Sequence, residues 1–282
     1  MQYGNTRGAR ADTGGCNPMM QRIVTGAIAG VAFAGLLWLG GWFYAGLLAV
    51  MAIIGFAEFV KLNGQSSARW DVIAAYIAVI LLTLTHLPGE WALTLPAFES
   101  TVWVLGLLLL SATVFSKNKI NLEHASLLLL GAVYVGTGFH YMLATRELAH
   151  GVFWSAVAFV CIWSSDAGAY FVGKAIGRTK LWPAISPNKT IEGSAGGLLL
   201  AVVAALIFAW SRPEWLGYGQ AVVIGVVAAV AGQLGDLIQS AYKRFRGVKD
   251  SGSLLPGHGG ILDRTDSWLI VFPMLHLLGL IG

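Results

Sequence analysis

Charged residues are scarce in this sequence of 282 residues, at 11% of the chain, whereas an ordinary soluble domain carries roughly 25%. Hydrophobic residues make up 56% of the chain, and the mean hydropathy is +0.70. This combination excludes a soluble globular protein and predicts one polytopic membrane domain. The formal net charge of +4 lies in the loops between apolar runs. We therefore interpret it as a topology signal and expect no nucleic-acid partner.

Cysteine is nearly absent as well. The two cysteines, Cys16 and Cys161, lie in a polar tail and in an apolar segment. They exclude a disulfide framework and a multi-thiolate metal site, and they imply no oxidising compartment. Several familiar motifs are also missing, since the sequence has no Walker A motif, no GxGxxG after a predicted strand and no HExxH.

Residues 1–19 lack apolar periodicity and are rich in Gly, Asn, Thr and Arg, so we expect a disordered N-terminal tail. The apolar run from Ile23 is too long for the core of a signal peptide and has no small-residue cleavage site after it, so it predicts a retained anchor. Met20 suits a natural start as well as Met1 does. We expect residues 20–282 to form a single transmembrane catalytic domain, with the catalytic half at about residues 152–282.

A helix needs about 20 residues to cross the hydrocarbon core of a bilayer, and the apolar runs repeatedly match that length. They predict an all-α fold of about nine transmembrane helices, at residues 23–40, 42–59, 71–87, 97–115, 124–145, 152–173, 194–210, 219–240 and 262–281. With the N-terminus in the cytoplasm, 16 of the 18 Lys and Arg residues lie on the inner side, and only Arg146 and Arg212 lie on the outer side. The positive-inside rule favours this orientation.

Two predicted inner loops, residues 174–193 and 241–261, are far longer than the others. Together with Arg264 they hold nine basic residues. Cationic loops can serve topology and lipid headgroups alone, but that interpretation leaves the neighbouring acids unexplained. Long charged loops in a compact domain usually form functional sites. We therefore expect these two cytoplasmic loops to form the active site.

Four aspartates lie within predicted spans or at their ends. Asp166 lies inside the sixth span, and Asp236 lies near the inner end of the eighth. Asp263 and Asp266 open the last span, three residues apart on one helix face. The alternatives to function are an ion pair for Asp236 and helix capping for the last two. Carboxylates in a span are costly and suit a hard divalent cation, so we predict a Mg²⁺ site.

Basic residues and glycines surround these acids. In the second loop, residues 256–260 form a glycine turn that contains His258, and glycines let backbone N–H groups approach phosphate oxygens. In the first loop, Lys189 lies among hydroxyl side chains that suit a phosphate. The alternatives are an ordinary tight turn and a lysine that only reaches the membrane interface. Acids for Mg²⁺ beside many cations predict phosphoryl or nucleotidyl transfer, in which catalysis is mainly positioning and charge neutralisation.

Two segments resemble a known family. The segment from Ser240 to Asp266, SAYKRFRGVKDSGSLLPGHGGILDRTD, closely resembles the signature of phosphatidate cytidylyltransferase, also called CDP-diacylglycerol synthase. The segment from Ser165, SDAGAYFVGKAIGRTKLWPAISPNKTIEGSAGG, resembles the preceding block of that family. The rest of the chain is similar only in hydropathy and in a glutamate on the second span, here Glu58 in GFAEF.

The resemblance implies a multi-helix, homodimeric enzyme of the bacterial cytoplasmic membrane. It implies that CTP and phosphatidate from the inner leaflet react with the help of Mg²⁺ to give CDP-diacylglycerol and pyrophosphate, at an active site that faces the cytoplasm. It also implies a metal centre at Asp236 and Asp263, with a monovalent cation such as K⁺ as a further candidate. We extend the metal role to Asp266 and Asp166.

The remaining candidate residues carry charge or approach phosphate. The expected catalytic residues are Lys243, Arg244, Lys249, Asp250, His258 and Arg264. The expected substrate-binding residues are Ser186, Asn188, Lys189, Thr190, Ser240, Gly257, Gly259 and Gly260.

Two other functions fit parts of the pattern. Another lipid phosphotransfer enzyme, such as a polyprenol or phytol kinase or an archaeal-type lipid cytidylyltransferase, needs the same charged groups. A kinase releases a nucleoside diphosphate and a cytidylyltransferase releases pyrophosphate, so product analysis separates them. An ion-coupled transporter also uses acids within spans, but it predicts acids near the middle of the bilayer, whereas these cluster toward the inner face.

Overall fold

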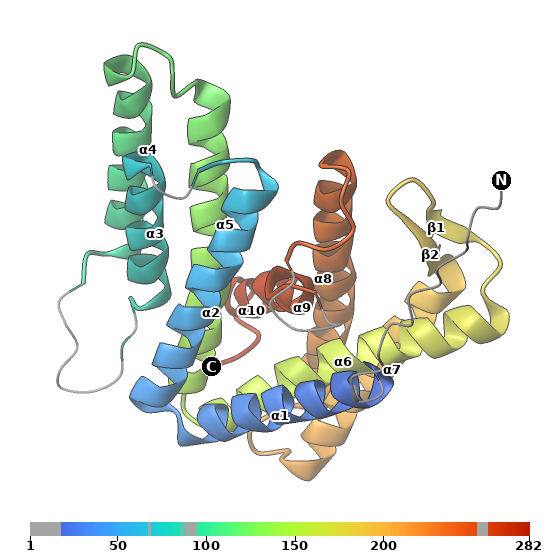
Figure 1. Cartoon of the computed structure of the whole chain (residues 1–282). Coiled ribbons are helices and arrows are strands. Elements are labelled where there is room, and N and C mark those ends of the chain that lie inside the picture. The colour runs from blue at the N-terminus through green and yellow to red at the C-terminus, as the bar shows by residue number, and fades with distance from the viewer. Residues whose placement is uncertain (1–17, 67–68, 86, 88–94, 253–258) are drawn as a thin grey trace, which may run out of the picture.

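Helices make up most of the chain (Figure 1), as the apolar runs predict. The computed structural model describes residues 18–66, 69–85, 87, 95–252 and 259–282, and the side chains from residue 24 onward. In that part of the chain, six helices are long and apolar enough to cross a membrane. They are α2 (Gly41–Leu62), α4 (Phe98–Phe115), α5 (Leu122–Glu147), α6 (Gly151–Ile176), α7 (Ile191–Ser211) and α8 (Tyr218–Phe245). The predicted disordered tail lies almost wholly outside the described residues.

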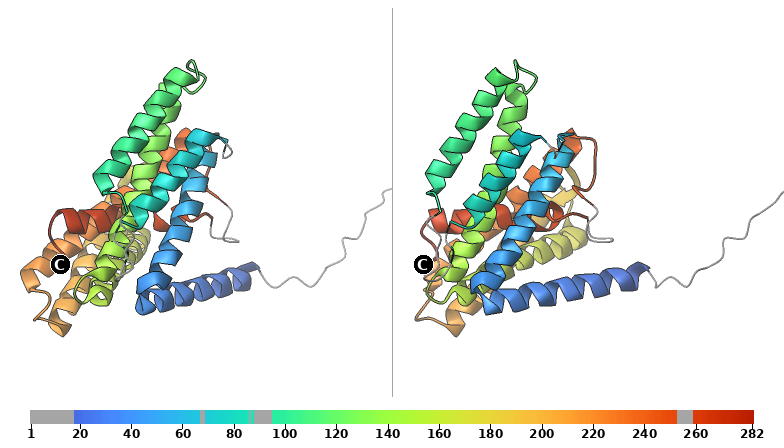
Figure 2. Two further views of the ribbon diagram at one scale, coloured as in Figure 1. Left: turned by 90° about the vertical axis from the view of Figure 1, so that its left-hand side faces the viewer. Right: turned by 60° about the vertical axis from the view of Figure 1, so that its left-hand side comes forward.

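Three further helices have shorter described apolar stretches. They are α1 (Pro18–Leu39, with Val24–Leu39 as its described apolar part), α3 (Trp70–Thr83) and α10 (Trp268–Leu277). Every predicted apolar run therefore forms a helix, but the structure does not confirm nine crossings. At 1.5 Å per residue, α10 is about 15 Å long, which is half the hydrocarbon thickness. Both views of Figure 2 show α1 at a steep angle to α2.

The last predicted span is divided in two. A single turn, α9 (Leu262–Thr265), precedes α10, and Asp266 and Ser267 lie between them. The α10 side chains Leu269, Phe272 and Leu275 are fully or almost fully buried, so this face of the helix packs inside the bundle. Helix α10 contacts both α5 and α8 and lies between them in Figure 1.

The expectation of an all-α chain is wrong at one place, because the first long loop folds into a hairpin. Its strands are β1 (Lys180–Trp182) and β2 (Ser186–Thr190), antiparallel, with Lys180 opposite Thr190. The carboxylate of Glu192 accepts hydrogen bonds from the backbone N–H groups of Arg178 and Thr179, each at 3.1 Å, and so fixes the base of the hairpin. Strands of three and five residues are too short to show a period, so the sequence offered no signal for them.

The α6–α7 pair carries the hairpin and packs unusually closely. A Cβ atom at Gly168 of α6 would lie 2.7 Å from the backbone oxygen of Gly196 on α7, so only glycine permits this approach. Small residues of this kind bring helix backbones together in membranes. The β1–β2 hairpin at the end of this pair is thereby held beside the end of α8 (Figure 1).

Candidate active site

A cavity of about 440 Å³ opens between α6, the β2–α7 junction, the end of α8 and α9. It collects residues from both long loops and from four helices. The predicted site residues that line it are Asp166, Asn188, Lys189, Thr190, Asp236, Lys243, Asp250, Asp263, Arg264 and Asp266. The fold therefore brings together most of the charged residues that the sequence singled out, from positions up to 100 residues apart.

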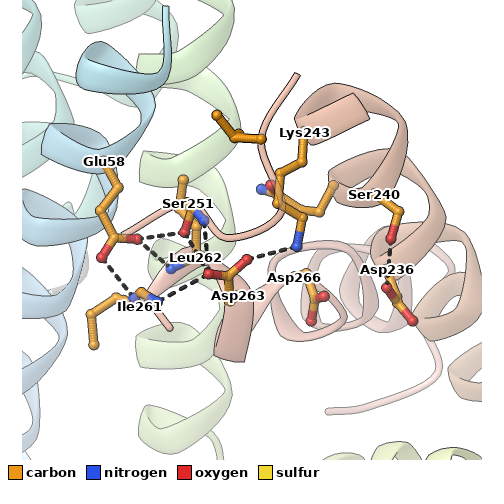
Figure 3. Close-up of polar contacts among 12 residues, drawn as sticks. Glu58, Asp236, Ser240, Lys243, Ser251, Ile261, Leu262, Asp263 and Asp266 are labelled. Atoms are coloured by element: carbon orange, nitrogen blue, oxygen red, sulfur yellow. Dashed lines mark hydrogen bonds and ion pairs between the residues drawn. The ribbon is translucent and has the colours of Figure 1, made fainter. Parts of the chain in front are cut away.

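The first of two ion pairs in this cavity joins β2 to α8. The Nζ atom of Lys189 lies 2.5 Å from Oδ2 of Asp236, and the two side chains are 23% and 36% exposed. The other carboxylate oxygen, Oδ1, accepts a hydrogen bond from Oγ of Ser240 one turn later in α8, at 3.2 Å (Figure 3). Asp236 thus has one lysine and one hydroxyl as partners, and its carboxylate remains open to the cavity.

The second ion pair joins α8 to α9. The Nζ atom of Lys243 donates to Oδ1 of Asp263 at 2.6 Å, and these side chains are 13% and 6% exposed. Oδ2 of Asp263 accepts from the backbone N–H groups of Ser251 (2.8 Å) and Gly260 (3.0 Å), and from Oγ of Ser251 (3.0 Å). Burial alone would raise the pKa of Asp263, but the hydrogen bonds from Lys243, Gly260 and Ser251 hold that pKa below its usual range.

Asp266 is the most strained acid of the cavity. In Figure 3 its side chain lies between those of Asp263 and Asp236, and it has no lysine partner there. Burial and the negative charge of Asp236 raise the pKa of Asp266 to about 7, against a hydrogen bond from the N–H of Ser267. Gly235 of α8 packs directly on the backbone oxygen of Asp266. A side chain at position 235 would therefore push this acid away from the cavity.

The charges that line the cavity suit a divalent cation. Five aspartates and three basic residues line it, which leaves a formal excess of two negative charges. Asp166, Asp236 and Asp266 offer carboxylate oxygens from three separate elements, the ligands that Mg²⁺ prefers. Among the described residues, however, no three acidic, histidine or cysteine side chains converge closely enough to enclose an ion. The donor chemistry therefore fits a metal, but the carboxylates must change rotamer to surround one.

Some predicted site residues do not reach the cavity. Arg244 and Lys249 are exposed, and Arg244 donates to the backbone oxygen of Val248. Ser186, Ser240, Gly259 and Gly260 are not among the residues that line the cavity. The hydroxyl of Ser240 donates to Asp236, and the N–H of Gly260 donates to Asp263. Thr190 does line the cavity, but its hydroxyl also caps α7 by accepting from the N–H of Gly193. Gly257 and His258 lie outside the described residues.

Sequence reasoning missed several residues at the site. Gln233 lines the cavity and donates to the backbone oxygen of Ser194 at 3.2 Å, which ties α8 to α7. Ser251 connects the second loop to Asp263. Glu58, on α2, is buried against that same loop. The family resemblance points to Glu58, a carboxylate near the end of an apolar span, but assigns it no role, whereas nothing local distinguishes Ser251 or Gln233.

These features define a helical integral membrane protein with a charged cavity at the ends of its helices. The chain belongs to the cytidylyltransferase family, because the sequence model of that family matches residues 20–281. It is similar to the phosphatidate cytidylyltransferase of Bacillus subtilis (strain 168), with 40% identity over 265 residues, 92% of this chain and 97% of the relative. The phosphatidate cytidylyltransferase of Staphylococcus haemolyticus (strain JCSC1435) is 37% identical over 260 residues, 92% of this chain and 98% of the relative.

Proposed function

We propose that this protein transfers the cytidylyl group of CTP to phosphatidate, which gives CDP-diacylglycerol and pyrophosphate. Its family and the names of its relatives support this activity. The observation that carries the proposal is the cavity, where carboxylates and lysines from three elements face one another. A site that joins two polyanions needs both kinds of group.

The chemistry places few demands on proton transfer. The phosphate of phosphatidate is largely dianionic near neutral pH, since comparable phosphomonoesters have a second pKa of about 6. Its oxygen attacks the α-phosphorus of CTP, the bond from that phosphorus to the bridging oxygen breaks, and pyrophosphate leaves with the electron pair. The main barrier is the repulsion between two anions, so the protein must supply positive charge and in-line positioning.

The basic residues of the cavity supply part of that charge. Lys189 and Lys243 hold their Nζ atoms against Asp236 and Asp263 at the cavity wall, where an entering phosphate competes for them. Arg264 lies beside them in α9. We assign these three residues to phosphate binding, whereas Arg244 and Lys249 act farther out, on the approach of CTP from solvent.

We assign Mg²⁺ to Asp236, Asp266 and Asp166. Asp263 joins this set only where its Oδ1 exchanges Lys243 for the ion, because Oδ2 already accepts three hydrogen bonds. An ion held there would polarise phosphoryl oxygens and neutralise the charge of the departing pyrophosphate. A monovalent cation such as K⁺ is a candidate for a second position. Asp250 either orients Lys249 or completes the ligand set, and His258 donates to a phosphoryl oxygen.

We place the protein in the bacterial cytoplasmic membrane with the cavity toward the cytoplasm, where CTP is found. The concentration of basic residues at the ends of α2, α6 and α8 supports this orientation. It requires the chain to alternate sides from α2 to α8, so that the short helix α3 also crosses. Phosphatidate enters sideways from the inner leaflet. A homodimer agrees with the family resemblance.

A reconstitution experiment tests the activity. Detergent-purified protein is incubated with labelled CTP and phosphatidate, with and without Mg²⁺, and CDP-lipid and pyrophosphate are measured. We expect equal amounts of both products, only with the metal ion. Release of CDP with a phosphorylated lipid would instead identify a lipid kinase, and solute flux in liposomes without turnover would identify a transporter.

A further inference from the structure

Glu58 lies on α2, in the half of the chain that carries none of the cavity residues, yet it contacts the second loop. Its side chain is buried, with a residue exposure of 7%. Oε1 accepts a hydrogen bond from the backbone N–H of Ile261 at 2.9 Å. Oε2 accepts from the N–H of Leu262 and from Oγ of Ser251, each at 2.9 Å (Figure 3). One buried carboxylate therefore holds the end of the loop and the start of α9.

Asp263 contacts the same segment from the cavity side. It accepts from the backbone N–H groups of Ser251 and Gly260, and Oγ of Ser251 lies 3.0 Å from its Oδ2. The hydroxyl of Ser251 thus lies between the carboxylates of Glu58 and Asp263, although it has only one proton to donate. The carboxylates of Glu58 and Asp263 therefore each connect Ser251, near the start of the loop, to residues 260–262 at its end.

The loop backbone is fitted closely around Glu58. A Cβ atom at Gly252 would lie 2.5 Å from Oε1 of Glu58, and a Cβ atom at Gly260 would also collide with this carboxylate. A side chain at either position would therefore displace the carboxylate of Glu58. No basic side chain pairs with Glu58 in the hydrogen bonds and ion pairs of the described residues. Backbone and hydroxyl donors from the loop satisfy the charge instead.

We propose that Glu58 is a positioning residue for cytidylyl transfer. It fixes the backbone of residues 251 and 260–262, and this backbone in turn places Asp263, Arg264 and Asp266 in the cavity. Glu58 is not among the residues that line the cavity. This role rests on the proposed function, because its catalytic consequence is measured as turnover of CTP and phosphatidate.

The variant Glu58→Gln tests the role with little change of shape. A glutamine has one acceptor oxygen and one NH₂ group, so either Ile261 or the Leu262–Ser251 pair faces a donor and loses its acceptor. We expect kcat to fall by about 10- to 100-fold, the range seen when groups that orient a site's ligands are removed. The KM values for both substrates should change much less. In hydrogen-exchange mass spectrometry, peptides that cover residues 259–265 should exchange faster than in the wild type.

Asp71→Asn is the matched control. Asp71 is another buried carboxylate of the same half of the chain, and it is paired with Arg69 at 2.9 and 3.1 Å, away from the second loop. This variant should lower the unfolding temperature but leave kcat per folded molecule and exchange at residues 259–265 unchanged. Equal kcat losses in Glu58→Gln and Asp71→Asn would show that Glu58 is merely structural, and a wild-type kcat in Glu58→Gln would overturn the proposal directly.

Two further measurements keep the test decisive. Glu58→Asp retains the charge but is one methylene shorter, so its kcat should lie between those of wild type and Glu58→Gln. If Glu58→Gln does not fold, Glu58→Asp is judged by the same kcat and exchange criteria. If the wild type makes no CDP-lipid while exchange at residues 259–265 still responds to Glu58, then the proposed function fails but the contact stands.

Discussion

The two lysine–aspartate pairs of the cavity have the same chemistry but different surroundings. Lys189 and Asp236 are partly exposed, and Asp236 has only Ser240 as a further partner. Lys243 and Asp263 are more deeply buried, and Asp263 accepts from Lys243 and from the backbone N–H groups of Ser251 and Gly260, with Oγ of Ser251 3.0 Å from its Oδ2. The carboxylate oxygens of Asp236 therefore remain able to bind a ligand, whereas those of Asp263 mostly accept hydrogen bonds that hold the second loop.

The partly exposed pair is therefore suited to binding a ligand, whereas the buried pair is suited to holding the second loop in place. An exposed ion pair contributes about 0–1 kcal/mol to stability, so the Lys189–Asp236 pair can open for a ligand at little cost. A buried pair that loses one partner leaves an uncompensated charge and costs about 3–5 kcal/mol. The Lys243–Asp263 pair should consequently remain closed until a ligand replaces it. The following substitutions test this contrast.

Asp263→Asn should have the largest effect, because it removes both a cavity charge and the acceptor that organises the loop. We expect CTP-dependent product to be abolished and the free energy of unfolding to fall by about 3 kcal/mol, since Lys243 is left with no buried counter-charge. Membrane insertion should remain normal. Product assays and thermal unfolding in detergent measure the two effects, and near-normal turnover of the purified variant would remove Asp263 from the mechanism.

Asp236→Asn should separate activity from stability. We expect kcat to fall by about 10²- to 10³-fold, the loss typical of a removed electrostatic group at a reacting centre, with less than about 1 kcal/mol of destabilisation. Parallel measurements of turnover and chemical unfolding check this expectation. A stability loss as large as that of Asp263→Asn would mean that the two pairs are equivalent and that the contrast is wrong.

Substitutions of the two lysines should show the same contrast between the ion pairs, with smaller effects on activity and stability. Lys189→Ala and Lys243→Ala each remove a charged phosphate donor, so the KM for CTP or phosphatidate should rise by about 10-fold or more. Lys243→Ala should in addition lower the unfolding temperature, because Asp263 loses its cation, whereas Lys189→Ala should not. Unchanged kinetics for both substrates in either variant would exclude that lysine from the site.

Asp266→Asn should produce the most pH-dependent change in stability. In the folded protein, burial and Asp236 raise the pKa of Asp266 to about 7, whereas an unfolded aspartate has a pKa of about 3.9. The cost of ionising Asp266 therefore lowers the stability of the metal-free fold progressively between about pH 4 and pH 7 and is complete above pH 7. With metal chelated, the variant should unfold at a higher temperature than wild type at pH 8, and this difference should shrink as the pH falls and vanish near pH 4. A lower unfolding temperature at pH 8 would show that Asp266 is a stabilising charge. The variant should still lose activity.

Most of the charged residues at the cavity could be predicted from the sequence. A charge within or beside an apolar run costs free energy, so it is rare there and indicates a function. Asp166, Asp236, Asp263 and Asp266 are examples. Their partners could not be predicted in this way. Lys189 and Asp236 are 47 residues apart, and Glu58 and Ile261 are 203 residues apart, so these contacts depend on helix packing that no local pattern records.

The sequence by itself determined that this is a helical membrane protein and which segments become helices, since hydrophobic length is a local property that the bilayer selects. It also determined where charge concentrates. Only the tertiary structure decided that the last predicted span is divided into α9 and the short α10, that the first long loop forms a hairpin, and that Arg244 and Lys249 lie outside the cavity. It also decided that Asp236 is free to bind while Asp263 holds a loop, because the burial and hydrogen-bond partners of a carboxylate depend on neighbours that folding brings from distant parts of the chain.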